Sequence, residues 1–167
     1  MSKSEQNLRD AFAGESQANR RYLAFSKVAA EEGFPNIARL FRVVAESETI
    51  HAHNHLKAMG GIKSTLQNLQ EAWQGEKDEY SSMYPMFLDQ AKRDANNAAL
   101  NTFFWANEAE KTHGEFYERA IEALKQGKDL ELKELHICSV CGYTVEGVPP
   151  DKCPNCGVGQ EKFEVIT

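Results

Sequence analysis

The sequence lacks the features that mark several classes of protein. None of its hydrophobic runs is long enough to span a bilayer, so we expect no transmembrane helix. The first ten residues, MSKSEQNLRD, are polar and contain no apolar stretch of signal-peptide type, which favours a cytoplasmic location. The formal net charge is −6 and no basic block stands out, so nucleic acid is not an expected partner.

Cysteine is absent from the first 137 residues, and all four cysteines fall in the last 30. They form two C-x-x-C pairs, Cys138 with Cys141 and Cys153 with Cys156, separated by 11 residues. In a reducing compartment this clustering indicates a metal site rather than disulfides. Four thiolates at this spacing predict tetrahedral coordination of zinc or iron. Zinc would make the segment a structural ribbon, whereas iron would make it a one-electron carrier.

Four long stretches carry apolar residues at helical spacing. We expect helices at about residues 4–32, from before Ile37 to Met59, at 65–93 with a bend at Pro85, and at 97–126. The fold class is therefore mostly α: a four-helix bundle over residues 1–126, a charged linker over 127–134 and a small metal-knuckle domain over 135–167. That last segment is too short to fold stably unless a bound metal links its parts.

Carboxylates and imidazoles interrupt the apolar faces of these helices. An E-x-x-H motif occurs on the second helix and again on the fourth, and a single inward Glu precedes each motif, by 33 and 31 residues. Isolated buried carboxylates are costly unless they are paired or bind a metal. One Glu from each of two helices and E-x-x-H from each of the other two is the pattern of di-iron or di-manganese bundles. We therefore predict a di-metal site formed by Glu15, Glu48, His51, Glu79, Glu110 and His113.

Tyr22 lies two turns after Glu15 on the same stripe. A buried tyrosine hydroxyl needs a hydrogen-bond partner. The ring either fills the core or places its hydroxyl on a ligand carboxylate, and the sequence favours neither.

Together these motifs resemble the rubrerythrins over nearly the whole chain. The segment AGESQA at 13–18 is similar to the first-helix signature of that family, and EYSSMYP from Glu79 and the two E-x-x-H motifs are similar to its other iron-ligand motifs. The tail CSVCGYTVEGVPPDKCPNCG resembles a rubredoxin domain with a shortened loop. The resemblance implies a ferritin-like bundle that acts as a non-haem di-iron peroxidase, reducing hydrogen peroxide to water in defence against oxidative stress.

The resemblance also implies the cofactors and partners of this reaction. Two iron ions would occupy the bundle, and one iron would occupy the four-cysteine site, where zinc can replace it in recombinant protein. Electrons would come from NAD(P)H through a separate reductase or a rubredoxin. A homodimer or larger oligomer is implied, with head-to-tail pairing that brings the rubredoxin-type iron of one subunit near the di-iron site of another.

The chain departs from the family pattern at one position. The resemblance implies a fifth carboxylate one turn after Glu79, which exchanges with the second-helix histidine as the redox state changes. Ser82 stands there instead, and Glu76, one turn before Glu79, is a less favoured substitute. We therefore expect His51 to stay bound in both redox states, or water to take the place of the carboxylate.

Three other functions fit the same residues. The bundle could be a ferroxidase or iron-handling protein that reacts mainly with oxygen. It could belong to an electron-transfer protein in which the di-metal site is not the final acceptor. Alternatively, both sites could hold zinc, which would make the protein a structural module.

Overall fold

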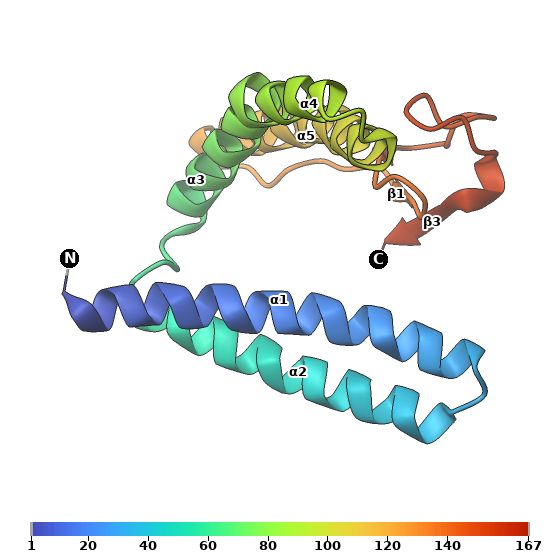
Figure 1. Ribbon diagram of the computed structural model, residues 1–167. Coiled ribbons are helices and arrows are strands. Elements are labelled where there is room, and N and C mark those ends of the chain that lie inside the picture. Colours follow the sequence, from blue (N-terminus) through green and yellow to red (C-terminus); the bar gives the residue numbers. More distant parts are fainter. Residues whose placement is uncertain (1, 167) are drawn as a thin grey trace. The chain divides into compact units, whose positions relative to one another are not determined.

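The computed structural model describes residues 2–166 and divides into two compact units, one up to Lys63 and the other from Ser64 onward. Figure 1 shows the elements of both. Helices account for most of the chain, and a small sheet lies at its C-terminal end, so the expected fold class is confirmed. Within the described residues, no helix is long and apolar enough to cross a bilayer.

The first unit is a hairpin of two helices, α1 (Lys3–Glu31) and α2 (Pro35–Ala58) (Figure 1). A capping box starts α1, because the Ser2 hydroxyl accepts from the Glu5 N–H and the Ser2 N–H donates to the Glu5 carboxylate. Gly33, at a φ of 84°, turns the chain, and Pro35 occupies the first turn of α2, where its missing N–H costs nothing. The bounds of α1 agree with the expected helix to within one residue.

Small side chains line the seam between these helices. Ala38, Ala45 and Ala52 are buried at intervals of seven residues along α2. Their size lets the two backbones approach closely enough for polar side chains of α1 to reach the main chain of α2. Asn19 Nδ2 donates to the Ala45 carbonyl at 2.7 Å, and Ser26 Oγ donates to the Ala38 carbonyl at 2.9 Å. These bonds fix the register of the two helices.

The second unit begins with α3 (Thr65–Asp78), a π-helical turn (Glu79–Met83) and α4 (Tyr84–Arg93), all of which lie along α5 (Asn97–Lys125) (Figure 1). The expected bend in the third helix is therefore a π-helical segment just before Pro85. Pro85 itself stands in the first turn of α4, the part of a helix that best tolerates proline. π-Helical turns inside longer helices are frequent at functional sites.

Each unit contains a cluster of three aromatic rings. The centroids of neighbouring rings lie 5.7–6.3 Å apart in the first unit and 5.4–6.3 Å apart in the second. The clusters are formed by Tyr22, Phe25 and Phe41, and by Tyr84, Phe87 and Phe103. This correspondence extends the internal repeat seen in the spacing of the acidic residues.

The C-terminal part of the second unit is a three-stranded antiparallel sheet in the order β2-β1-β3. Its strands are β1 (Leu135–Cys138), β2 (Thr144–Glu146) and β3 (Phe163–Ile166), with a 3₁₀ turn at Gln160–Lys162. Residues 128–134, within the expected linker, form neither helix nor strand.

Candidate metal centres

In the first unit, Glu15, Glu48 and His51 bring one ligand atom each to within 4.8 Å of one another. Glu15 comes from α1, while Glu48 and His51 lie one turn apart on α2. His51 Nδ1 is 2.8 Å from Glu48 Oε2, and the two side chains are 51% and 16% exposed. Two carboxylates and an imidazole form a mixed oxygen and nitrogen ligand set that suits a first-row divalent metal.

In the second unit, the same ligand types meet at Glu76 on α3 and at Glu110 and His113 on α5. His113 Nδ1 lies 2.7 Å from Glu110 Oε2 and 3.7 Å from Glu76 Oε2. Both predicted E-x-x-H motifs therefore point an imidazole and a carboxylate toward one another, and each gains a second carboxylate from the preceding helix. The two groups, which we call the first and second ligand groups, have the same composition.

The second ligand group is arranged to attract positive charge. Burial, followed by the hydrogen bond to Glu110, raises the pKa of Glu76 to about 7. Burial alone would raise the pKa of Glu110, but hydrogen bonds from His113 and Glu76 hold it below its usual value. The hydrogen bond to Glu110 also raises the pKa of His113. Two carboxylates thus share one proton beside an imidazole, and a divalent cation could replace that proton. These donors fit a bound metal.

The predicted ligand Glu79 is not one of the three residues that meet in the second ligand group. It begins the π-helical turn, and burial together with the charge of Glu110 raises its pKa, so it lies within electrostatic reach of the group. Glu76, the less favoured residue in sequence, holds the position closer to His113. The sequence does contain a signal for Glu76: E-x-x-E at 76–79 places both carboxylates on one helical face, with the spacing of E-x-x-H.

Glu76 changes the count of carboxylates near the predicted ligands. Glu79, Glu76 and Glu110 make three in the second unit, and the first ligand group has two. The fifth carboxylate, expected to be missing at Ser82, therefore has a candidate one turn before Glu79 rather than one turn after it.

Tyr22 packs its ring against Phe25 and Phe41, with centroids 6.3 and 6.2 Å away. Within residues 2–166 its hydroxyl forms no hydrogen bond. Packing thus accounts for the ring, and a bond from the hydroxyl to a ligand carboxylate stays a prediction.

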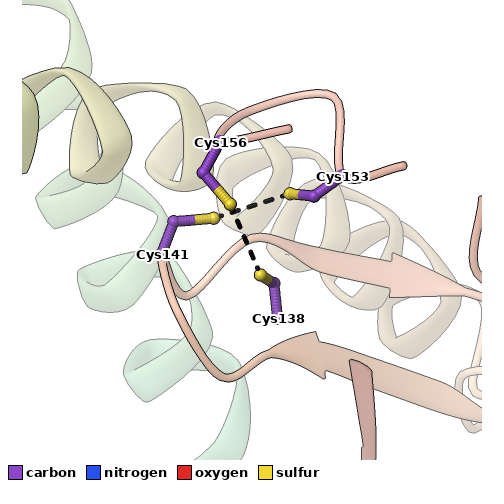
Figure 2. A group of neighbouring side chains, drawn as sticks. All are labelled: Cys138, Cys141, Cys153 and Cys156. Carbon is purple, nitrogen blue, oxygen red and sulfur yellow. Dashed lines mark hydrogen bonds between the residues drawn. The ribbon is translucent and has the colours of Figure 1, made fainter. Parts of the chain in front are cut away.

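The four cysteine sulfurs converge on one point (Figure 2). The Sγ atoms are 3.7 Å apart for Cys138 and Cys156 and 3.6 Å apart for Cys141 and Cys153. A tetrahedron with metal–sulfur bonds of about 2.3 Å has edges of about 3.8 Å, whereas a disulfide bond measures about 2.0 Å. The observed separations fit a four-thiolate metal site and exclude disulfides.

Each cysteine pair forms the same turn. Gly142 and Gly157 follow the second cysteine of each pair at φ values of 78° and 79°, a region that side chains rarely adopt. Their N–H groups donate to the carbonyls of Cys138 and Cys153 at 2.9 and 2.8 Å. Burial raises the pKa of the Cys141 thiol, which favours a cation as the partner that makes all four sulfurs thiolates.

The domain that carries the cysteines contacts α5 at three places. Asn155 Nδ2 donates to the Trp105 carbonyl at 2.8 Å, and Arg119 Nη1 donates to Glu146 Oε2 at 2.7 Å. Between them, His113 Nε2 lies 3.0 Å from the hydroxyl oxygen of Thr144. At about 1.5 Å per residue, these contacts extend over about 21 Å of α5. No sequence pattern predicts these contacts, because they depend on single side chains of a short strand and a turn.

Comparison with known proteins agrees with both kinds of site. The Rubrerythrin family model matches residues 6–121, and the model described as "Rubrerythrin, rubredoxin-like domain" matches residues 136–164. Rubrerythrin-2 of Clostridium acetobutylicum is 38% identical, over 95% of this chain and 94% of that protein. Nigerythrin of Nitratidesulfovibrio vulgaris is 35% identical, over 95% of this chain and 84% of that protein.

Solved structures of nigerythrin are similar as well. Its mixed-valence state has a TM-score of 0.55 at 32% identity, and the match covers 99% of this chain and 88% of the nigerythrin chain. A fully reduced form, described as all ferrous, has a TM-score of 0.56 with the same identity and coverage. With a ferritin-like helical part followed by a four-cysteine domain, and with relatives matched along nearly their whole length, the chain belongs to the rubrerythrin family.

Proposed function

We propose that this protein is a non-haem di-iron peroxidase. It reduces one molecule of hydrogen peroxide, with two protons and two electrons, to two molecules of water. The two ligand groups hold two iron ions, which supply the pair of electrons when reduced, and the four-cysteine site holds a third iron that restores them one at a time. The metal ligands in this proposal are Glu15, Glu48, His51, Glu76, Glu79, Glu110, His113, Cys138, Cys141, Cys153 and Cys156.

The observation that carries the proposal is the second ligand group, which is hydrogen-bonded to the four-cysteine domain. An iron-storing or oxygen-reducing bundle has no evident use for a one-electron carrier beside a ligand. A zinc ribbon would not need a contact with a histidine that faces two carboxylates, at 2.7 and 3.7 Å. A peroxidase that is re-reduced in single-electron steps needs both features together.

Glu76 and Glu79 lie one turn apart and both face the charge of Glu110. One of them can stay bound to a metal while the other binds in only one redox state, since the charge of the site changes between the states. In this proposal Glu76 or Glu79 takes the role of the exchangeable carboxylate that is missing at Ser82.

The electron donor in this proposal is an NAD(P)H-dependent reductase or a rubredoxin, and the compartment is the reducing cytoplasm, where four thiolates stay available to a metal. A homodimer or larger homo-oligomer is part of the proposal, in keeping with the family resemblance. Zinc in the four-cysteine site of recombinant protein would abolish electron delivery without changing the fold, because zinc has no redox chemistry.

The proposal predicts a division of labour that Cys153→Ser can test. Iron-loaded, anaerobically reduced protein is mixed with one equivalent of hydrogen peroxide, and its visible spectrum is followed. The wild type should show oxidation of the carboxylate-bound iron and then the return of the red ferric–thiolate bands. The variant should keep the single peroxide-driven oxidation but lose turnover with NADH and reductase. Loss of the single oxidation as well would contradict the proposal.

The same spectra discriminate the alternatives. Ferric–thiolate bands that return faster with air than with peroxide would indicate an oxygen-reducing ferroxidase. Bands that respond to neither oxidant, in a protein that still exchanges electrons with a reductase, would indicate an electron-transfer protein. A colourless protein with full zinc occupancy after expression in iron-rich medium would favour the structural module.

A further inference from the structure

A groove follows the seam between α1 and α2 on a different side of the hairpin from the first ligand group. Two cavities of about 540 and 220 Å³ lie along it, and Arg20 lines both. At 3.6 residues per turn, Arg20 and Lys27 lie about 140° and 120° around α1 from Glu15. Arg42 lies about 120° around α2 from Glu48. The groove therefore belongs to a surface that the metal ligands of this unit do not occupy.

The larger cavity carries positive charge without a compensating acid. Three cations line it, Arg20, Lys27 and Arg42, and no acidic residue of the described part of the chain does. Within residues 2–166, none of the three forms an ion pair. The surroundings are basic as well, because residues 1–63 contain nine Lys or Arg and seven Asp or Glu, although the whole chain has a net charge of −6. Unpaired cations gathered in one cavity attract an anion.

A buried hydroxyl holds Arg42 in place. Ser26, which is only 4% exposed, accepts from Arg42 Nη1 at 3.2 Å and donates to the Ala38 carbonyl at 2.9 Å. A guanidinium has five N–H donors in a planar fork that matches the oxygens of a phosphate group. The bond to Ser26 uses one of these donors and orients the others, so less side-chain entropy is lost when an anion binds.

The larger cavity also has an apolar wall, formed by Leu23, Ala24 and Ala30. A bare inorganic ion would leave this wall in contact with water. The volume of about 540 Å³ lies in the range of sites for small organic molecules. Three cations beside an apolar wall fit an organic phosphate. A nucleoside diphosphate carries about three negative charges at pH 7, which matches the three cations in number.

We propose that the groove between α1 and α2 is a binding site for a nucleoside diphosphate. Its phosphates contact Arg20, Lys27 and Arg42, and its organic part lies on the apolar wall. Ser26 is a positioning residue, because it acts on the ligand only through Arg42. The site shares no residue with the metal ligands, so this inference goes beyond the proposed function and does not depend on it.

Fluorescence titration with N-methylanthraniloyl-ADP tests the site in zinc-loaded, full-length protein in magnesium-free buffer. We expect saturable binding that unlabelled ADP reverses. Arg20→Gln and Arg42→Gln should each weaken binding about tenfold, since each removes charged hydrogen bonds to phosphate. Arg21→Gln removes the neighbouring cation of α1, which lines neither cavity, and should bind like the wild type. An equal loss in Arg21→Gln, or no saturable binding in the wild type, would overturn the proposal.

Competing probes separate the parts of the ligand. Inorganic phosphate and adenosine should each displace the labelled ADP only at far higher concentration than ADP itself. Phosphate that competes as well as ADP would refute a role for the apolar wall, and adenosine that does so would refute the role of the cations. Ser26→Ala keeps all three charges but releases Arg42, so it should weaken ADP binding several-fold and leave adenosine binding unchanged.

Two further outcomes would contradict the site. ADP could instead chelate the bound metal, in which case Glu48→Gln would weaken its binding; we expect the same ADP affinity as in the wild type. A second copy of the chain could cover the groove, in which case Arg42→Gln would change the sedimentation coefficient and ADP would not bind. We expect the oligomer to sediment alike with and without ADP, and in both the wild type and the variant.

Thermal unfolding in the absence of ADP checks that each arginine variant is folded. Added ADP should raise the unfolding temperature of the wild type and of Arg21→Gln, because a ligand that binds only the folded state stabilises it. The same addition should have much less effect on Arg20→Gln and Arg42→Gln. An equal rise in all four proteins would place ADP elsewhere on the molecule and reject the groove as its site.

Discussion

At the scale of single residues, sequence spacing located the two E-x-x-H motifs but chose between Glu76 and Glu79 less well. Both lie on the face of the third helical region that is turned toward Glu110. Helical periodicity cannot distinguish between residues three apart on one face. The π-helical turn that starts at Glu79 also changes the direction of the side chains, and no residue pattern predicts such a turn. The choice depends on the three-dimensional structure, in which Glu76 lies 3.7 Å from His113 Nδ1.

Two matched variants decide between these carboxylates. Glu76→Gln should weaken binding of zinc or cobalt at the second ligand group at least tenfold. Removing a metal ligand should lower the metal affinity at least as much as removing a hydrogen-bond partner of a ligand. Glu79→Gln should have a smaller effect on the divalent metal. Titration of the metal-free protein against a competing chelator measures both. A larger loss in Glu79→Gln would restore the assignment predicted from the sequence and reject Glu76 as the constant ligand.

At the scale of elements, the helices were predictable because apolar periodicity and end signals agree. Gly33 and Pro35 mark the turn between α1 and α2, and α5 ends where expected, before Gly127. The seam of buried alanines in α2 was not predicted, because small residues carry a weak hydrophobic signal. Its role emerges only from the Asn19 and Ser26 bonds that the close approach permits.

The contact between α3 and α5 predicts a pH-dependent stability in the metal-free protein. The pKa of Glu76 is about 7 in the folded state against an ordinary value of 4.5. Below 4.5 the group is protonated in both states and costs nothing, whereas above 7 it is ionised beside Glu110 and destabilises the fold. Stability should therefore fall as pH rises from 4.5 to 7. The loss should be about 1 kcal/mol once solvent screening is allowed for.

Glu76→Gln isolates this effect, because an amide resembles the protonated carboxyl. Thermal unfolding should show the variant more stable than the wild type at pH 8 and nearly equal to it at pH 4.5. Glu118→Gln changes an exposed residue of α5 and should follow the wild type at both pH values. An advantage for Glu76→Gln that is larger at pH 4.5 than at pH 8 would contradict the sign of the predicted shift.

At the scale of the whole molecule, the order of the two metal patterns along the chain was enough to predict the fold class and the family. The attachment of the cysteine domain to α5 was not predictable in the same way. It depends on the path of residues 128–134 and on single side chains such as Thr144 and Asn155, which stand in turns or at the edge of a strand. The composition of a linker limits how far a domain can extend from the preceding helix, but it does not determine which surface the domain contacts.

The cysteine domain also predicts what metal removal does to the molecule. Among residues 135–166, only His136, Cys138 and Cys153 are buried, so the sheet has no apolar core apart from its metal ligands. A segment of this size folds only when the metal supplies the missing free energy. Removing the metal with a chelator, or by Cys138→Ser combined with Cys153→Ser, should unfold the sheet while the helices remain.

Amide NMR spectra should then show random-coil positions for β1, β2 and β3, and far-ultraviolet circular dichroism should keep its helical signal. The hydrogen bond between His113 and Thr144 should be lost as well, because the sheet that carries Thr144 has unfolded. Arg119→Met, which removes the partner of Glu146 and leaves the cysteines intact, should keep the sheet folded. Dispersed strand amides after complete metal removal would mean that the domain folds without its metal.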